Sequence, residues 1–286
     1  MVNWFLNKGL KQGIFWAIMI YFIGTINDVI ARMLGNRLHA IEIAFFRFLF
    51  SAIIVLIPML RAKTNLFKSS MHSWHISRGI LGAIALGLCC YSVNIMPLAE
   101  NTTILFSEAL FMLPLAAIFL KENVKKIAIF ATIIGFLGLI IMFRPDARNI
   151  NILAIIPTLA ALLFAIMNIM IKKMIDSKEN TLTMLFYFGL YTTIISAIIV
   201  PKYWITPNLN EIFLIFLLGI GANLIQLFIF LAYRATTASS ISPIRYTELP
   251  FAVFFGWLFF NQIPDMTTLI GSLLIISGAF IASTNR

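Results

Sequence analysis

The sequence has few of the residues on which most soluble proteins and enzymes depend. Charged residues make up 11% of the 286-residue chain, against about 25% in an average globular domain. The two cysteines, Cys89 and Cys90, are adjacent, so the chain has no cysteine framework for disulfides or a metal. His72 and His75 lack a third ligand nearby in the sequence, and we interpret them as residues of the membrane interface. We predict no metal and no cofactor.

Recognisable catalytic patterns are also missing. The sequence contains no HxxxxD, HExxH, paired-aspartate or P-loop pattern. A membrane-embedded acyl or glycosyl transferase, the enzyme alternative, would need such a nucleophile and base or a metal cluster near the interface. A structural subunit of a larger assembly, which needs no such pattern, is a further alternative. We predict that the protein is not an enzyme.

Apolar residues dominate instead, at 61% of the chain. Crossing a bilayer core as a helix takes about 20 apolar residues, and runs of about that length recur from end to end. The sequence therefore predicts an all-α integral membrane protein of ten transmembrane helices. The expected spans are residues 12–34, 39–60, 76–96, 98–120, 127–144, 152–173, 180–200, 211–234, 238–260 and 266–283.

The basic residues mark the orientation of these spans. The net charge is +10, but the Lys and Arg residues lie between the apolar runs rather than on one patch, so we predict no nucleic-acid partner. If the loops alternate between the two sides, one side takes fourteen of these residues, Arg78 among them, and the other takes five. The positive-inside rule then predicts that both termini are cytoplasmic.

The second half of the sequence repeats the first at an offset of 140. Glu108, Gly79 and Gly138 superpose on Glu248, Gly219 and Gly278. We therefore predict two five-helix repeats, residues 12–144 and 152–283. Since each repeat has an odd number of spans, the second is inverted relative to the first. Inverted repeats are typical of secondary transporters, in which a central site opens to each side in turn.

Of the charged residues inside the predicted spans, four are the strongest functional candidates, namely Arg47, Glu108, Arg245 and Glu248. A charge at the bilayer centre costs at least about 2.5 kcal/mol, so such a residue is a functional candidate. Either arginine is suited to hold a substrate carboxylate by two hydrogen bonds. Either glutamate is suited to meet a substrate cation or a coupling proton. A structural ion pair between helices is the alternative.

Other polar and aromatic residues complete the candidate site. Asn27, Asn168, Tyr91 and Tyr246 are candidates for substrate binding, and Asp28 is a candidate gating residue. Hydrogen bonds between membrane helices and simple packing explain the asparagines and tyrosines equally well. For Glu42, we expect a solvated position at the end of its span, with an extracellular gate as the alternative.

Several motifs resemble the EamA-type drug/metabolite transporters. Residues 114–123 (PLAAIFLKEN) and 135–138 (GFLG) are similar to the helix 4 to helix 5 signature of that family, and residues 259–262 (FFNQ) are similar to its second copy. Within the superfamily, the segments 27–29 (NDV), 44–48 (AFFRF), 78–81 (RGIL), 184–187 (MLFY), 203–207 (YWITP) and 245–249 (RYTEL) resemble the S-adenosylmethionine uptake carriers of obligate intracellular bacteria. Glu108 departs from this pattern, which has an apolar or small polar residue there.

The resemblance implies two inverted EamA-like repeats in a multi-pass protein of the cell inner membrane. It also implies a secondary transporter whose partners are the lipid bilayer and a small metabolite, with S-adenosylmethionine as the specific substrate, taken up or exchanged. A proton-coupled exporter of amino acids or drugs is the alternative in the same class. The sequence leaves open whether the protein works alone or as a homodimer.

Overall fold

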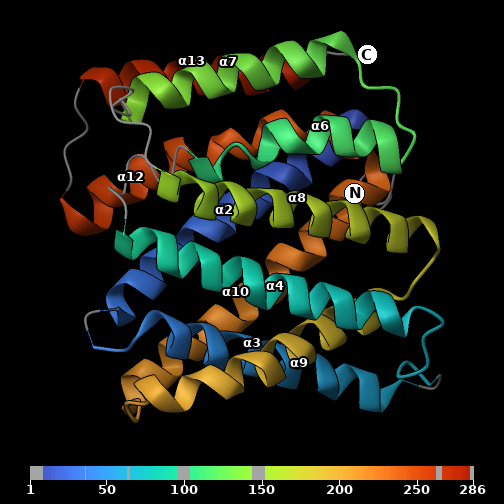
Figure 1. Ribbon diagram of the computed structural model, residues 1–286, viewed down its shortest axis with the longest axis vertical. Helices are drawn as coiled ribbons and strands as arrows, with labels where there is room; N and C mark the ends of the chain where they lie inside the picture. The colour runs from blue at the N-terminus through green and yellow to red at the C-terminus, as the bar shows by residue number, and fades with distance from the viewer. Residues whose placement is uncertain are drawn as a thin grey trace.

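The described residues of the protein form helices, turns and loops, without a strand among them (Figure 1). The computed structural model describes residues 9–35, 37–62, 65–95, 104–143, 152–261 and 266–283. In chain order, the α-helices are α2 (Leu10–Leu34), α3 (Ala40–Arg61), α4 (His72–Ile95), α6 (Glu108–Phe119), α7 (Lys126–Phe143), α8 (Ile155–Asp176), α9 (Thr181–Ile199), α10 (Leu209–Ala235), α11 (Ala238–Ile241), α12 (Glu248–Phe260) and α13 (Met266–Ser283). The 3₁₀ segments are η1 (Ile152–Ala154), η2 (Val200–Tyr203) and η3 (Ser242–Thr247).

Polar side chains at several loop ends fix where the helices start. The Asn180 side chain accepts a hydrogen bond from the backbone N–H of Leu182 at the start of α9, at 2.8 Å. Asn208 and Glu211 form a reciprocal capping box at the start of α10. Such caps satisfy backbone donors that the first helical turn leaves without a partner. The helix boundaries therefore follow local sequence chemistry as well as hydropathy.

The helix predicted over residues 238–260 is not continuous in the structure, which divides it into α11, η3 and α12. Pro243 lies at the start of η3 and has no N–H to donate to a continuing helix. The predicted span over residues 98–120 lies partly outside the described residues. Its described part has a turn at residues 106–107, after which α6 begins at Glu108. Glu108 and Glu248 are thus each the first residue of a helix.

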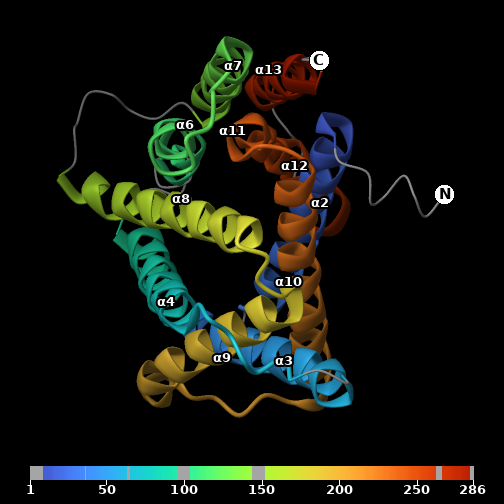
Figure 2. The ribbon, with the colours of Figure 1, turned by 90° about the vertical axis from the view of Figure 1, so that its right-hand side faces the viewer.

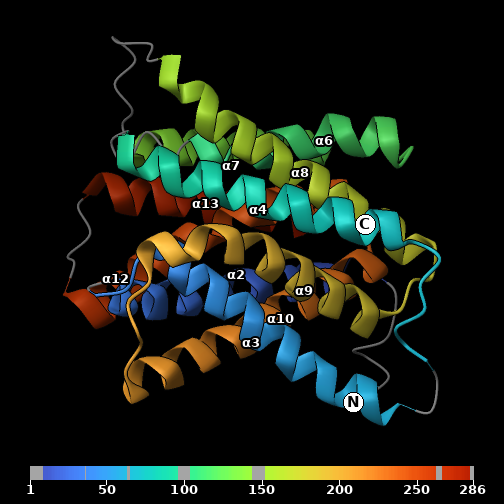
Figure 3. The same cartoon turned by 60° about the horizontal axis from the view of Figure 1, so that its bottom comes forward.

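Helices from the two halves of the sequence pack against each other throughout the molecule. Helix α7 lies beside α13, α2 beside α10, α3 beside α9 and α4 beside α8. Figure 2 shows the α7–α13 pair at one end of the molecule and α3 with α9 at the other. Figure 3 shows α3, α9 and α10 together from that second end. The space between these pairs holds the buried polar residues described below.

The outer surface is apolar. Five helices in the described part of the chain are long and apolar enough to cross a membrane: α2, α3, α8, α10 and the segment Thr181–Tyr203, which covers α9 and η2. Large side chains such as Phe130, Leu273 and Phe280 point outward from α7 and α13, with 56%, 64% and 68% exposure. A surface of this kind is stable against lipid tails rather than water. The protein is therefore embedded in a membrane.

Glycine allows the close contact between α7 and α13. A Cβ at Gly138 would lie 2.8 Å from the carbonyl oxygen of Gly271, whereas a Cβ at Gly87 meets no atom within 4 Å. We expect Gly138→Ala to destabilise the protein by about 1–3 kcal/mol, because the two helix backbones would have to separate. The Gly87→Ala control should be neutral or slightly stabilising. Thermal unfolding of the purified variants in detergent checks this, and equal melting temperatures would contradict it.

Candidate functional site

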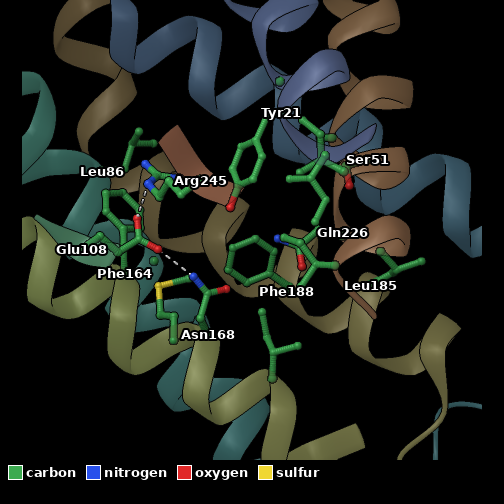
Figure 4. A pocket seen from close by; sticks show the side chains of 18 of the residues that line it. Tyr21, Ser51, Leu86, Glu108, Phe164, Asn168, Leu185, Phe188, Gln226 and Arg245 are labelled. Atoms are coloured by element: carbon green, nitrogen blue, oxygen red, sulfur yellow. Dashed lines mark hydrogen bonds and ion pairs between the residues drawn. The ribbon is translucent and has the colours of Figure 1, made fainter. Parts of the chain in front are cut away.

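A cavity of about 320 Å³ lies between the two halves of the protein. Its volume is within the range of about 300–1,000 Å³ that is usual for small-molecule sites. Helices α2, α3, α4, α8, α9 and α10 form most of its wall, and the start of α6 and the α11–η3–α12 segment close it. Figure 4 shows side chains from these elements pointing into it. Five of the predicted charged residues line it: Asp28, Arg47, Glu108, Arg245 and Glu248.

One charged group is centred on Glu108. Its Oε2 lies 3.1 Å from Nε of Arg245, and its Oε1 accepts a hydrogen bond of 2.8 Å from Nδ2 of Asn168 (Figure 4). Nη1 of Arg245 lies 3.7 Å from Oε2 of Glu248. The Glu108 side chain is only 4% exposed, whereas those of Arg245 and Glu248 are 24% and 22% exposed. Glu108 is thus enclosed by its partners, and the other two charges face the cavity.

The breaks in the helices explain how this group comes together. Glu108 and Glu248 each begin a helix, where the N-terminal end of the helix dipole favours a carboxylate. The 3₁₀ segment η3 carries Arg245 and leads directly into α12. The Ser242 hydroxyl of η3 donates a hydrogen bond to the carbonyl oxygen of Ala109 on α6, which holds η3 beside α6. Broken helices of this kind surround central sites in secondary transporters.

A second charged group lies on α2 and α3. Asp28 is exposed to the cavity, and Arg47 is partly buried beside it. Neither residue forms an ion pair with any other described residue, and Nε of Arg47 is buried without a hydrogen-bond partner among them. A guanidinium that has no ion-pair partner and an unused buried donor is well suited to bind the carboxylate of a ligand.

The lining therefore combines charge with apolar and aromatic surface. Among the described residues that line the cavity, three carboxylates and two guanidinium groups leave a formal charge of −1 when all are ionised. Tyr21, Phe48, Phe164 and Phe188 supply aromatic rings. The arrangement fits a ligand with a carboxylate, an excess of positive charge and a flat ring.

Three of the candidate residues lie away from the cavity. Asn27 is buried against α10, where its Nδ2 lies 3.4 Å from the carbonyl oxygen of Leu218. The ring of Tyr246 is fully buried, stacked on Phe106. Tyr91 lies on α4 with 56% of its surface exposed, and it is not part of the described lining. We therefore leave these three out of the binding set proposed below and keep Arg47, Glu108, Arg245, Glu248, Asn168 and Asp28.

The structure also adds two polar residues that the sequence analysis did not include. Arg78 was predicted to lie with the cytoplasmic loop residues, but it is 0% exposed inside α4. Its Nη2 donates a hydrogen bond of 3.0 Å to Oε1 of Gln226, and Gln226 lines the cavity. Its Nη1 donates to the carbonyl oxygen of Met184 at 3.3 Å. The apolar run 211–234 contains two polar amides, Asn223 and Gln226, and such residues inside a span were the signal for Gln226.

Glu42 differs from its expected place as well. It is 0% exposed rather than solvated, and its Oε1 accepts a hydrogen bond of 3.2 Å from the backbone N–H of Ile205. This contact ties α3 to the segment between η2 and α10. Glu42 is not among the described residues that line the cavity, so its observed contact is a structural one.

Comparisons with known proteins identify the family and the fold of the chain. The profile of the EamA-like transporter family matches residues 11–144 and again residues 151–284. The chain is 37% identical to the S-adenosylmethionine uptake transporter of Rickettsia conorii, over 95% of this chain and 93% of that protein. It is 24% identical to the pseudopaline exporter CntI of Pseudomonas aeruginosa, over 97% and 98%. A solved crystal structure has the same fold, with a TM-score of 0.78 and 14% identity over 96% of both chains.

Proposed function

This chain belongs to the EamA-like transporter family, and from that premise we propose that it carries S-adenosylmethionine across the membrane through the central cavity. The observation that carries the proposal is the charge set of the cavity. S-adenosylmethionine has a carboxylate, an ammonium group, a sulfonium centre and an adenine ring, with one net positive charge. The cavity has one net negative charge, a guanidinium without an ion pair among the described residues, and aromatic side chains.

We assign each group of the substrate to a side chain whose charge or hydrogen-bonding atoms are not already used by other described residues. Arg47 receives the carboxylate, because its guanidinium is not engaged by any described carboxylate. Glu248 faces the positive centres, because its side chain is partly exposed to the cavity and its ion pair with Arg245 is long, at 3.7 Å. Asp28 is on the same cavity wall as Arg47 and serves the ammonium group or gates access to it. Phe48 and Phe164 stack on the adenine.

The transmembrane arrangement is part of the same proposal. We propose ten spans in two inverted repeats, 12–144 and 152–283, in the inner membrane of a bacterium, with both termini in the cytoplasm. Lys121 and Asn261, which are 140 residues apart, both adopt a left-handed backbone conformation, with φ of 54° and 51°, just after α6 and α12. The pairs α2–α10 and α8–α4 are equivalent under the repeat, as are α6–α8 and α12–α2. This internal symmetry supports alternating access.

Uptake by the purified chain in proteoliposomes tests the proposal. We expect labelled S-adenosylmethionine to accumulate above the level of protein-free vesicles, and unlabelled S-adenosylhomocysteine to compete with it. Vesicles loaded with unlabelled substrate should take up label faster if the transporter exchanges. Absence of uptake in correctly inserted protein would overturn S-adenosylmethionine as the substrate.

The second candidate is a proton-coupled exporter, and buried Glu108 is the observation that favours it. A carboxyl group enclosed at 4% exposure is a candidate proton carrier. Under this alternative, an imposed proton gradient drives transport, and Glu108→Gln removes that dependence. Under the leading proposal, uptake proceeds without the gradient. Measuring wild-type and variant uptake with and without the gradient separates the two.

A further inference from the structure

A second hollow lies on the outer side of the protein, between α4, α6 and α8, with a volume of about 540 Å³. Its walls are mostly apolar and include Leu115 and Phe119 of α6 and Ile166 and Met170 of α8. Figure 2 shows α8 running between α6 and α4. We call this hollow the α4–α6–α8 cleft.

The cleft is separated from the central cavity by α8. Met167 and Asn168 of that helix line the cavity, whereas the neighbouring Ile166 and Met170 line the cleft. The described linings of the two hollows share no residue. The cleft is therefore a separate site and not an extension of the transport path.

One end of the cleft is polar and basic. Lys173, Trp74, Ser73 and Ser77 line it there. Nζ of Lys173 lies 5.3 Å from the centre of the Trp74 ring, and Lys173 is exposed. The neighbouring Lys172 is the residue that pairs with Asp176, and no described carboxylate lies within ion-pair distance of Lys173. The cation is available to an anion from outside the chain.

This end also lies where a membrane surface is expected. Lys173 is in the last turn of α8, and Trp74 is in the first turn of α4. Tryptophan and lysine near helix ends are typical of the boundary between lipid tails and headgroups. The apolar walls run from that boundary toward the depth of the lipid tails.

We propose that the α4–α6–α8 cleft binds one anionic phospholipid, with its phosphate at Lys173 and an acyl chain along the apolar walls. Charge selects the lipid, because Lys173 has no carboxylate partner among the described residues. The Ser73 hydroxyl is a neutral donor for a remaining phosphate oxygen, whereas that of Ser77 already donates to the carbonyl oxygen of Ser73 at 2.8 Å. Basic pockets between transmembrane helices are the kind of site that holds anionic headgroups. A zwitterionic lipid brings its own cation to the same place and gains less.

We infer that lipid in the α4–α6–α8 cleft affects transport, an inference that rests on the proposed function. Helices α6 and α8 form two walls of the cleft and also carry Glu108 and Asn168, which are joined by the 2.8 Å hydrogen bond in the cavity. An acyl chain between these helices sets their separation beside Asn168, whose neighbours Ile166 and Ile169 line the cleft. Occupancy by lipid therefore favours one arrangement of the central charged group.

Binding is tested without any transport measurement, so its failure is distinct from a failure of the proposed function. The full-length chain is delipidated in detergent and titrated with phosphatidylglycerol or phosphatidylcholine of the same acyl chains, with thermal unfolding and native mass spectrometry as readouts. We expect one bound phosphatidylglycerol and a rise in melting temperature that phosphatidylcholine does not produce. Equal responses to the two lipids would overturn the proposal.

Variants locate the site. Lys173→Gln should weaken phosphatidylglycerol binding about fivefold, the value of one basic residue at the membrane surface. Lys178→Gln is the matched control, since it removes an exposed lysine just beyond α8 that does not line the cleft. Ile166→Trp should fill the cleft and prevent binding with Lys173 intact. Unchanged binding in both Lys173→Gln and Ile166→Trp would show that the lipid lies elsewhere.

Discussion

Replacing Arg245 with alanine should lower uptake of S-adenosylmethionine by at least about thirtyfold. Its guanidinium lies 3.1 Å from Glu108 and 3.7 Å from Glu248, and removing it leaves two neighbouring carboxylates without the cation that they share. Truncating one partner of a charge pair enclosed in this way costs about 2–5 kcal/mol in binding, because the other charge is left without its partner. The measurement is initial uptake in proteoliposomes, normalised to inserted protein.

Two controls separate loss of function from loss of fold. Arg37→Ala also removes an arginine from an ion pair, but that pair with Glu211 lies at the exposed end of α10, where its hydrogen bond raises the pKa of Arg37. Exposed pairs contribute little to stability, so uptake should persist. The double variant Glu108→Gln with Arg245→Met removes both charges and should recover stability but not uptake. If Arg245→Ala takes up S-adenosylmethionine at the wild-type rate, the charged group centred on Glu108 has a structural role only.

The sequence predicted the frame of this site better than its details. Hydropathy and the offset of 140 pointed to Glu108 and Glu248 as equivalent residues, and the structure begins a helix at each. Hydropathy averages over a window, however, so it joined α11, η3 and α12 into one span. The break depends on Pro243 and on a hydrogen bond from Ser242 to α6, and that contact is distant in sequence.

The sequence analysis missed Arg78 and Gln226 for related reasons. Arg78 lies six residues after the start of α4, close enough to the preceding loop to be grouped with its lysines, yet it turns inward. Charge counting assigns a residue to a side of the membrane and carries no information on which way it faces around the helix. Gln226 shows a related limit, since its polarity stands out in the sequence but its place in the cavity wall and its bond to Arg78 are seen only in the structure.

A second large effect on uptake is expected when the Arg78–Gln226 pair is broken. A guanidinium donates hydrogen bonds and accepts none, so its 3.0 Å bond to Gln226 fixes Oε1 toward Arg78 and leaves the amide nitrogen to face the cavity as a donor. Arg78 is therefore a positioning residue, and the donor it orients suits an acceptor on the substrate, such as a ring nitrogen of adenine.

We expect Arg78→Met to lower uptake about tenfold while the melting temperature stays equal or rises. A buried arginine without a carboxylate partner carries a desolvation cost, and an apolar side chain of similar length avoids it. The Gln226 amide is then free to turn, and losing one oriented hydrogen bond of about 1–1.5 kcal/mol gives roughly that change in rate.

A double-variant cycle distinguishes positioning from packing. Gln226→Leu should also lower uptake about tenfold, and adding it to Arg78→Met should lower uptake little further, because both changes remove the same oriented donor. The loss should appear as a raised KM for S-adenosylmethionine rather than as less inserted protein. If the two losses multiply, or if Arg78→Met unfolds the chain, Arg78 stabilises the helix packing around Phe188 and Phe230 and does not position Gln226.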